Sequence, residues 1–123
     1  MASIIVISGG GEGNYYPLGR RTNVIGRDEA LPIQLLDQHV SRKHLQIRYD
    51  KENDRYVAKD MNSRHGVFIN GRRIHSEVVL GDEDTIVLGE TTLMFTTRDF
   101  ADRASALEFH KTAGQRVKAT MLT

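Results

Sequence analysis

The sequence predicts an all-β fold, an antiparallel β-sandwich of about eleven short strands. Short runs of β-branched and aromatic residues recur along the chain, and polar or glycine-rich turns separate them. Several runs alternate with a period of two, and in Leu45–Tyr49 the apolar side chains stand at positions 45, 47 and 49. Such alternation is typical of antiparallel sheets with one buried face.

The first predicted strand, Ser3–Ser8, ends at the glycine loop of residues 9–13. The remaining strands follow at close spacing, at residues 15–18, 23–25, 33–36, 44–49, 56–60, 67–69, 72–74, 78–80, 85–88 and 91–97. Between two of them, Asn70-Gly71 suits the two positive φ angles of a type I′ hairpin. Polar turns of similar composition stand at residues 51–54, 81–84 and 89–90.

After Thr97 the composition changes, because glycine and β-branched residues give way to Ala, Leu, Glu and Lys. This change predicts a short α-helix with Asp99 as its N-cap. Three apolar side chains then share one helical face: Phe100, Ala104 and Leu107. We therefore expect two parts, a sandwich domain over residues 1–97 and a helical extension over residues 98–123.

The composition excludes several classes of protein. The chain has 123 residues, a net charge of +1 and no cysteine, so it suits one domain without disulfides, thiolate metal sites or a cysteine nucleophile. The apolar run Ile4–Ile7 is too short for a secretion signal, and none approaches the roughly 20 residues of a membrane helix. We expect a soluble, cytoplasmic protein that binds neither membranes nor nucleic acids.

The small net charge conceals an uneven distribution along the chain. Acidic residues dominate the turns at 50–54 and 82–84. Basic residues lie in or beside other predicted loops: Arg20, Arg21, Arg27, Arg42, Lys43, Arg64, Arg72 and Arg73. Because a sandwich gathers its loops at two ends, we expect one basic end that can bind an anion and one acidic end.

Three short motifs follow one another along the chain: Gly26-Arg27, Ser41-Arg42-Lys43-His44 and the segment 60–71, which contains Asp-x-x-Ser-x-x-Gly and ends in Asn-Gly. Together, on a strand-rich chain of this length, they resemble the forkhead-associated (FHA) domain. The resemblance covers about residues 3–97. It implies an eleven-stranded FHA/SMAD-like β-sandwich that binds phosphothreonine peptides through loops at one end and is not an enzyme.

The resemblance also implies roles for particular residues. It assigns the phosphopeptide contacts to Arg27, Ser41, Arg42, Arg64 and His65. A guanidinium group makes charge-assisted hydrogen bonds to a phosphate dianion, and a serine hydroxyl donates to a phosphate oxygen. Five further residues are expected to support the binding loops: Gly26, His44, Gly66, Asn70 and Gly71. The implied partner is a phosphothreonine-containing protein in a Ser/Thr kinase pathway, where the chain acts as an adaptor without cofactor or metal.

Residue 65 departs from the family pattern, which commonly has asparagine immediately before the glycine. In the family the asparagine amide clamps the peptide main chain and influences the choice of residue three places after the phosphothreonine. An imidazole lacks the paired donor and acceptor of an amide. Our hypothesis is that a positively charged His65 favours an acidic residue in the ligand.

Other interpretations of the same residues lead to different functions. A hydrolase would use Ser41 with His44 or His39 as base, but no Gly-x-Ser-x-Gly elbow surrounds the serine. A metal site would gather His39, His44 and His65, whose spacings fit no common ligand pattern. Nucleic-acid binding would use the loop arginines but lacks interleaved aromatic residues. The main alternative is a phosphate-independent interaction or dimerisation domain that uses the sandwich surface and the C-terminal helix.

Overall fold

The structure is a computed structural model that describes residues 2–98, 105, 108 and 111. In these residues the chain forms eleven strands arranged in two sheets. Each predicted strand is present, and its bounds differ from the prediction by no more than two residues at either end. The predicted helical extension over 98–123 lies outside the described residues, apart from the few named above.

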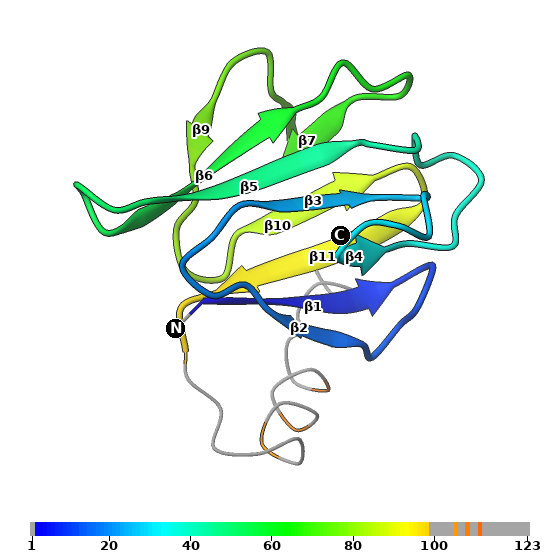
Figure 1. Cartoon of the computed structure of the whole chain (residues 1–123). Helices are drawn as coiled ribbons and strands as arrows, with labels where there is room; N and C mark the ends of the chain where they lie inside the picture. The colour runs from blue at the N-terminus through cyan, green and yellow to red at the C-terminus, as the bar shows by residue number, and fades with distance from the viewer. Residues whose placement is uncertain (1, 99–104, 106–107, 109–110, 112–123) are drawn as a thin grey trace.

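One sheet has six strands in the order β2-β1-β11-β10-β7-β8 (Figure 1). Their bounds are β1 Ser3–Ser8, β2 Tyr15–Pro17, β7 Val67–Ile69, β8 Arg72–Arg73, β10 Thr85–Leu88 and β11 Thr91–Thr96. The first and last strands pair antiparallel, with Ile4 opposite Phe95. The β7–β8 turn has φ angles of 51° at Asn70 and 82° at Gly71, which confirms the positive φ angles predicted for the hairpin.

The second sheet has five strands in the order β4-β3-β5-β6-β9. Their bounds are β3 Asn23–Gly26, β4 Ile33–Gln34, β5 Leu45–Asp50, β6 Arg55–Asp60 and β9 Val78–Val79. The β3–β4 pair is parallel, with Ile25 opposite Ile33, so the antiparallel prediction is wrong for this pair. Parallel neighbours usually need a long crossover. Here β4 is only two residues long, and the loop of residues 27–32 is sufficient.

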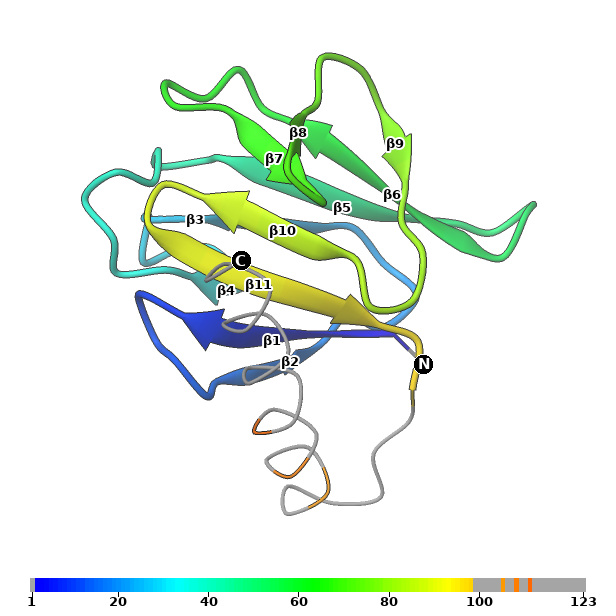
Figure 2. The same ribbon diagram turned by 180° about the vertical axis from the view of Figure 1, so that it is seen from behind.

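Apolar side chains from both sheets meet in the core. Those with no exposed surface include Ile4, Val6, Ile25, Leu45, Ile47 and Leu88, and burial of each stabilises the fold by about 1.5–3 kcal/mol. The outward-facing side chains of β1 are buried as well, because Ile5 and Ile7 form a second cluster with Met94. Figure 2 shows the six-stranded sheet in front of the five-stranded one.

The loops gather at two ends of the sandwich (Figure 1). The loops after β3, β4 and β6 share one end with the β10–β11 turn, and the β2–β3 and β5–β6 connections lie at the other. The predicted separation of charge is therefore wrong in part: Arg20 and Arg21 lie with the acidic turns, because they precede β3. Within the described residues, no helix has the length and apolar character to span a bilayer.

Candidate functional site

Three loops at one end of the sandwich hold the residues that the motifs single out: 27–32 after β3, 35–44 after β4 and 61–66 after β6. The first two loops are joined through their backbones. The amide of Arg27 donates to the carbonyl of Ser41 at 3.0 Å. The next amide, of Asp28, donates to the carbonyl of Arg42 at 3.2 Å. These bonds fix the position of the arginine and the serine relative to each other.

Gly26 is required by the close approach of these two loops. A Cβ at this position would lie 2.1 Å from the carbonyl oxygen of Arg42. That oxygen belongs to the backbone and already accepts a hydrogen bond from Asp28, so it has no room to shift. A residue without a side chain is the one that permits this contact.

His44 joins the second loop to the third from inside the protein, where it is completely buried. Its Nδ1 accepts a hydrogen bond from the amide of Ser41 at 2.9 Å. Its Nε2 lies 2.7 Å from the carbonyl oxygen of Gly66. An amide can only donate and a carbonyl can only accept, so the ring is neutral with its proton on Nε2. His44 therefore ties the Ser41 loop to the Gly66 loop.

The hydroxyl of Ser41 and the guanidinium of Arg27 each make one hydrogen bond within the protein and keep other donor hydrogens for a ligand. Ser41 Oγ accepts a hydrogen bond from the amide of Arg64 at 3.1 Å, which leaves its own O–H proton to donate. Arg27 Nε donates to the carbonyl of Val40 at 3.1 Å, which orients the guanidinium and leaves its terminal nitrogens for a ligand. Both side chains are therefore oriented before a ligand arrives.

Arg42 and Arg64 add two exposed guanidinium groups to the same end of the molecule. Among residues 2–98, no ion pair joins Arg27, Arg42 or Arg64 to a carboxylate. Together with the Ser41 hydroxyl they form a cluster of hydrogen-bond donors with positive charge. Such a cluster suits an anion with several acceptor oxygens, of which a phosphate monoester is the commonest in proteins.

The third loop has its own internal supports, Asp60 and Ser63. Asp60 Oδ1 accepts a hydrogen bond from the amide of Ser63 at 3.0 Å, and Ser63 Oγ accepts one from the amide of Gly66 at 3.0 Å. These side-chain turns set the path of the backbone on which Arg64 is carried. We assigned no role to Ser63 from the sequence, although its spacing of three from Asp60 and from Gly66 is the pattern that such turns leave.

A family model described as the FHA domain matches residues 23–89, which is more than half of the chain. The chain belongs to the FHA domain family. FhaA of Mycobacterium tuberculosis, named as an FHA domain-containing protein, is 36% identical over 84 residues. That alignment covers 68% of this chain and 15% of FhaA, so the chain corresponds to a small part of that relative's length.

Two solved structures share this FHA fold at useful sequence identity. One comes from a study of phosphothreonine-dependent FHA domain interactions and is 30% identical, with a TM-score of 0.72. The alignment covers 80% of this chain and 98% of the chain in that structure. The other is the FhaA FHA domain complexed with the intracellular domain of Rv3910. It is 32% identical and has a TM-score of 0.70, and the alignment covers 77% of this chain and 99% of the chain in that structure.

Asp37 braces the FHA loops in a way that we did not predict from the sequence. Its Oδ2 accepts hydrogen bonds from the Thr91 hydroxyl at 2.8 Å and the Glu90 amide at 2.9 Å, and its Oδ1 accepts one from the His39 amide at 2.9 Å. Burial disfavours the charged carboxylate, but these hydrogen bonds outweigh burial and hold the pKa of Asp37 below its usual value. Asp37 thus fastens the second loop to the β10–β11 turn.

His65, the residue that departs from the family pattern, lies beside His39. Their rings meet edge to face with centroids 5.6 Å apart. His39 also contacts Glu90, because its Nε2 lies 3.4 Å from Oε1 of that residue. The structure therefore places His65 at the end of the sandwich that carries the three motif loops, in contact with the second of them.

Asn70 and Gly71 lie at the end of β7 that points away from the three motif loops. Asn70 Nδ2 donates to Asp84 Oδ1 at 2.9 Å, and its Oδ1 accepts from the amide of Thr85 at 3.0 Å. The Asn-Gly pair therefore joins the β7–β8 hairpin to the start of β10. The expectation that Asn70 and Gly71 support the binding loops stays a prediction.

The geometry also bears on the hydrolase and metal interpretations. His44 accepts from the backbone amide of Ser41, so the ring does not face the hydroxyl as a catalytic base would. His39 and His65 meet at the surface while His44 is buried. Within the described residues, no group of three or more His, Cys, Asp or Glu side chains is placed to hold a metal ion.

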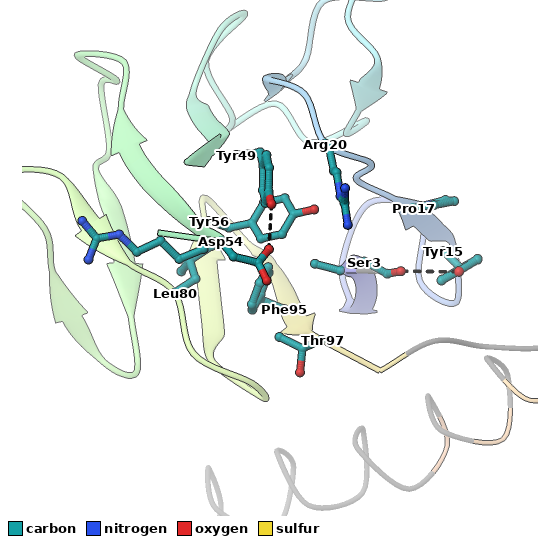
Figure 3. A pocket seen from close by; sticks show the side chains of 12 residues that line it. Ser3, Tyr15, Pro17, Arg20, Tyr49, Asp54, Tyr56, Leu80, Phe95 and Thr97 are labelled. Atoms are coloured by element: carbon teal, nitrogen blue, oxygen red, sulfur yellow. Dashed lines mark hydrogen bonds between the residues drawn. The ribbon is translucent and has the colours of Figure 1, made fainter. Parts of the chain in front are cut away.

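A pocket of about 880 Å³ lies at the opposite end of the sandwich (Figure 3). Its wall is largely aromatic, with Tyr49, Tyr56 and Phe95 packed against one another. The Arg20 guanidinium lies 5.9 Å from the centre of the Tyr49 ring. The Tyr49 hydroxyl already has a partner, because it donates to Asp54 at 2.7 Å. This pocket is remote from every residue of the three motif loops.

Proposed function

We propose that this chain is a binding module for phosphothreonine-containing peptides rather than an enzyme. Arg27, Ser41, Arg42 and Arg64 contact the phosphate, and His65 contacts the peptide beside it. The proposal rests chiefly on one observation: Arg27 and Ser41 are oriented on loops that are tied together, and among residues 2–98 no carboxylate pairs with Arg27, Arg42 or Arg64. The similarity to an FHA domain studied for phosphothreonine-dependent interactions supports the same ligand.

The cellular role that fits this module is that of a cytoplasmic adaptor in Ser/Thr kinase signalling. A phosphothreonine carries a charge of about −1.5 to −2 at neutral pH, so phosphorylation by a kinase creates the group that the loops bind. The likeness to an FHA domain solved in complex with another protein's intracellular domain is consistent with such a role. The partner is then a protein that carries the phosphorylated threonine.

Peptide binding tests this function directly. Fluorescence anisotropy should be measured with one peptide in three forms, carrying phosphothreonine, phosphoserine or unmodified threonine at the same position. We expect tightest binding of the phosphothreonine form, weaker binding of phosphoserine, because one buried methyl group adds about 0.8 kcal/mol, and hardly any binding of threonine. Equal affinity for the phosphorylated and unmodified peptides would support the phosphate-independent alternative instead.

A degenerate phosphothreonine library would then give the sequence preference. We propose that His65 influences the residue three places after the phosphothreonine and favours an acidic one. His65→Asn, which restores the common family residue, should change that preference and leave selection for the phosphate intact. The same preference in both proteins would show that His65 has no part in it.

We also propose that residues 1–97 form the FHA sandwich and residues 98–123 an extension that packs on it. Ile5, Ile7 and Met94 present an apolar cluster on the outer face of the sheet in which β11 ends. The predicted apolar face of the extension is complementary to it. Leu107→Asp should therefore lower the thermal unfolding midpoint, whereas Lys111→Gln, a change at an exposed position of the extension, should not, and equal midpoints would refute the packing.

A further inference from the structure

A polar cleft of about 510 Å³ borders the third loop on the side away from His39. One wall consists of residues from β6 and the loop that follows it, including Lys59, Asn62 and Ser63. The other wall runs from Arg73 in β8 to the segment 74–77. The cleft therefore lies where the two sheets meet beside the loop that carries Arg64.

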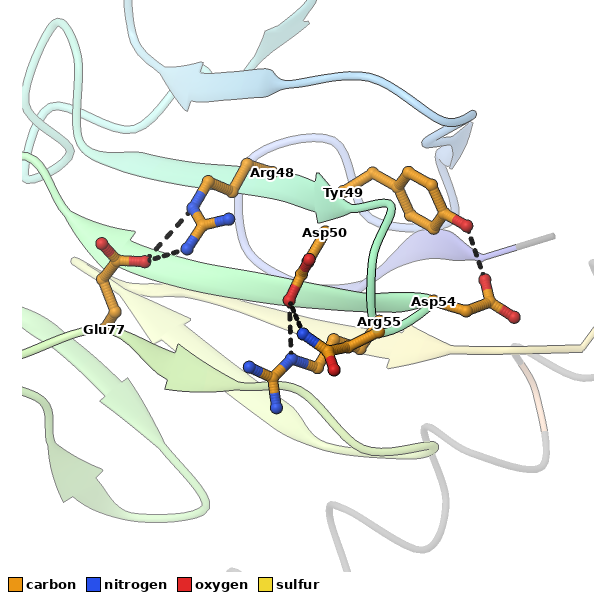
Figure 4. A network of polar contacts seen from close by, with 7 residues as sticks. Arg48, Tyr49, Asp50, Asp54, Arg55 and Glu77 are labelled. Atoms are coloured by element: carbon orange, nitrogen blue, oxygen red, sulfur yellow. Dashed lines mark hydrogen bonds and ion pairs between the residues drawn. The ribbon is translucent and has the colours of Figure 1, made fainter.

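In this cleft the acidic side chains have hydrogen-bond partners, whereas the basic side chains have none within the described part of the chain. Its two carboxylates are engaged: Asp60 accepts the Ser63 amide at 3.0 Å, and Glu77 accepts two hydrogen bonds from Arg48, at 3.2 and 2.6 Å (Figure 4). By contrast, three exposed bases of the cleft, Lys59, Arg73 and His75, have no ion pair or side-chain hydrogen bond within the described part of the chain. Because Arg48 compensates Glu77, the charges that remain in the cleft are those of Lys59 and Arg73 against Asp60, and their balance is positive.

Arg73 connects this cleft to the proposed phosphate site. A Cβ on Gly66 would lie 2.6 Å from Nε and 2.9 Å from Cζ of Arg73, so the guanidinium rests directly on the backbone of the third loop. Gly66 in turn is the residue whose carbonyl meets His44. Arg73 therefore borders both the third loop and the cleft.

We propose that the cleft binds acidic side chains of the ligand that flank its phosphothreonine. The ligand class is then narrower than a phosphothreonine peptide: it carries aspartate or glutamate within a few residues of the phosphothreonine, on the side that faces β8. This inference rests on the proposed function, because the phosphate must be anchored between the loops for its flank to reach Lys59, Arg73 and His75. An extended ligand advances about 3.3 Å per residue, which is why the acidic residue is expected within a few residues of the phosphothreonine.

Three phosphothreonine peptides of equal length test the proposal: one with glutamine at the flanking positions, one with glutamate before the phosphothreonine and one with glutamate after it. Fluorescence anisotropy at about 50 mM salt keeps exposed charge interactions measurable. We expect one glutamate peptide to bind about three- to ten-fold more tightly than the glutamine peptide, as several exposed ion pairs acting together allow.

The matched variants are Arg73→Gln and Arg72→Gln, because these neighbours in β8 carry the same charge and only Arg73 lines the cleft. Arg73→Gln should remove most of the gain from glutamate, Lys59→Gln should reduce it, and Arg72→Gln should preserve it. Equal losses in Arg73→Gln and Arg72→Gln, or no gain with either glutamate peptide, would overturn the inference while the glutamine peptide still binds. If the glutamine peptide itself does not bind, the proposed function fails and the inference fails with it.

Discussion

The two ends of the sandwich use the same residue type in opposite ways. At the aromatic end, Arg55 pairs with Asp50 at 2.9 Å (Figure 4). At the loop end, Arg27 is held only by a carbonyl, through Nε at 3.1 Å. An arginine with a carboxylate partner stabilises the fold, whereas one held by a neutral group keeps its charge for a ligand. The contrast explains why a chain with a net charge of +1 can hold an anion site.

The two ends also differ in how their loops are held. At the loop end, backbone and buried side-chain hydrogen bonds join segments that are far apart in sequence, such as His44 to Gly66 and Asp37 to Thr91. At the aromatic end, several contacts are local, such as Tyr49 to Asp54 within one hairpin. The loop end is therefore the end whose ligand geometry depends on a few individual residues.

The largest expected effect is that of His44→Ala. It leaves the Ser41 amide and the Gly66 carbonyl without partners in a buried site, at about 1–3 kcal/mol for each group. We expect a large fall in the free energy of unfolding, measured with urea, and loss of phosphopeptide binding. Tyr56→Phe is the control at the aromatic end, since it removes a buried hydrogen bond to Gly19. It should cost about 1 kcal/mol and leave affinity intact, and a similar loss of affinity in both variants would contradict the comparison.

Gly26→Ala should have the next largest effect. Its Cβ would collide with the Arg42 carbonyl at 2.1 Å, so the first two loops must separate, at about 1–3 kcal/mol for such overpacking. We expect reduced stability together with weaker phosphopeptide binding. Gly81→Ala is the matched control, because the nearest atom to its Cβ would be 3.8 Å away. Calorimetric titration that finds Gly26→Ala as strong a binder as Gly81→Ala would refute this role for Gly26.

A smaller effect is expected from the two carboxylates that brace opposite ends, Asp37 and Asp82. Burial opposes the ionisation of Asp82 as well, but hydrogen bonds from Thr97 and Thr96 outweigh it and hold the pKa of Asp82 below its usual value. Because both pKa values are lower in the folded state, their stabilising contribution is present above about pH 4 and is lost as pH falls further.

The dependence of stability on pH can be measured by urea unfolding at several pH values, from about 5.5 down to about 2.5. We expect Asp37→Asn to cost about 1–2 kcal/mol near neutral pH and Asp82→Asn to cost less, because Asp82 is exposed and solvent weakens its interactions. Each variant should flatten the fall in stability at acid pH. Only Asp37→Asn should also weaken phosphopeptide binding, because Asp37 holds the second loop to the β10–β11 turn. A pH dependence as steep as that of wild type in both variants would remove these carboxylates from the explanation.

The smallest effect belongs to Arg55→Ala. The Arg55 side chain is half exposed, which limits the ion pair to about 0.2–1 kcal/mol, and the largely covered Asp50 keeps a second hydrogen bond from Asn53 at 2.9 Å. We expect a change in the thermal midpoint close to the limit of measurement and no change in phosphopeptide affinity. A marked loss of binding would mean that the two ends are coupled.

Much of the fold could be predicted because its determinants are local. Alternation of apolar residues located the strands, and Asn70-Gly71 carries its turn type in two residues. The parallel β3–β4 pair was missed because it depends on how the loop of residues 27–32 returns the chain within one sheet. The position of Arg20 was missed because the chain crosses from one sheet to the other between β2 and β3. The role of Asp37 was missed for a similar reason: its partner Thr91 is 54 residues away, and no spacing rule predicts such a contact.

The central claim is that the loop-end arginines are kept for a phosphate, and the most direct test compares two arginines. Affinity for one phosphothreonine peptide should be measured by calorimetric titration for wild type, Arg27→Ala and Arg55→Ala. We predict that Arg27→Ala weakens binding by about 10- to 150-fold, the loss of one charge-assisted contact, and that Arg55→Ala leaves it unchanged. Unaltered binding by Arg27→Ala would contradict the claim.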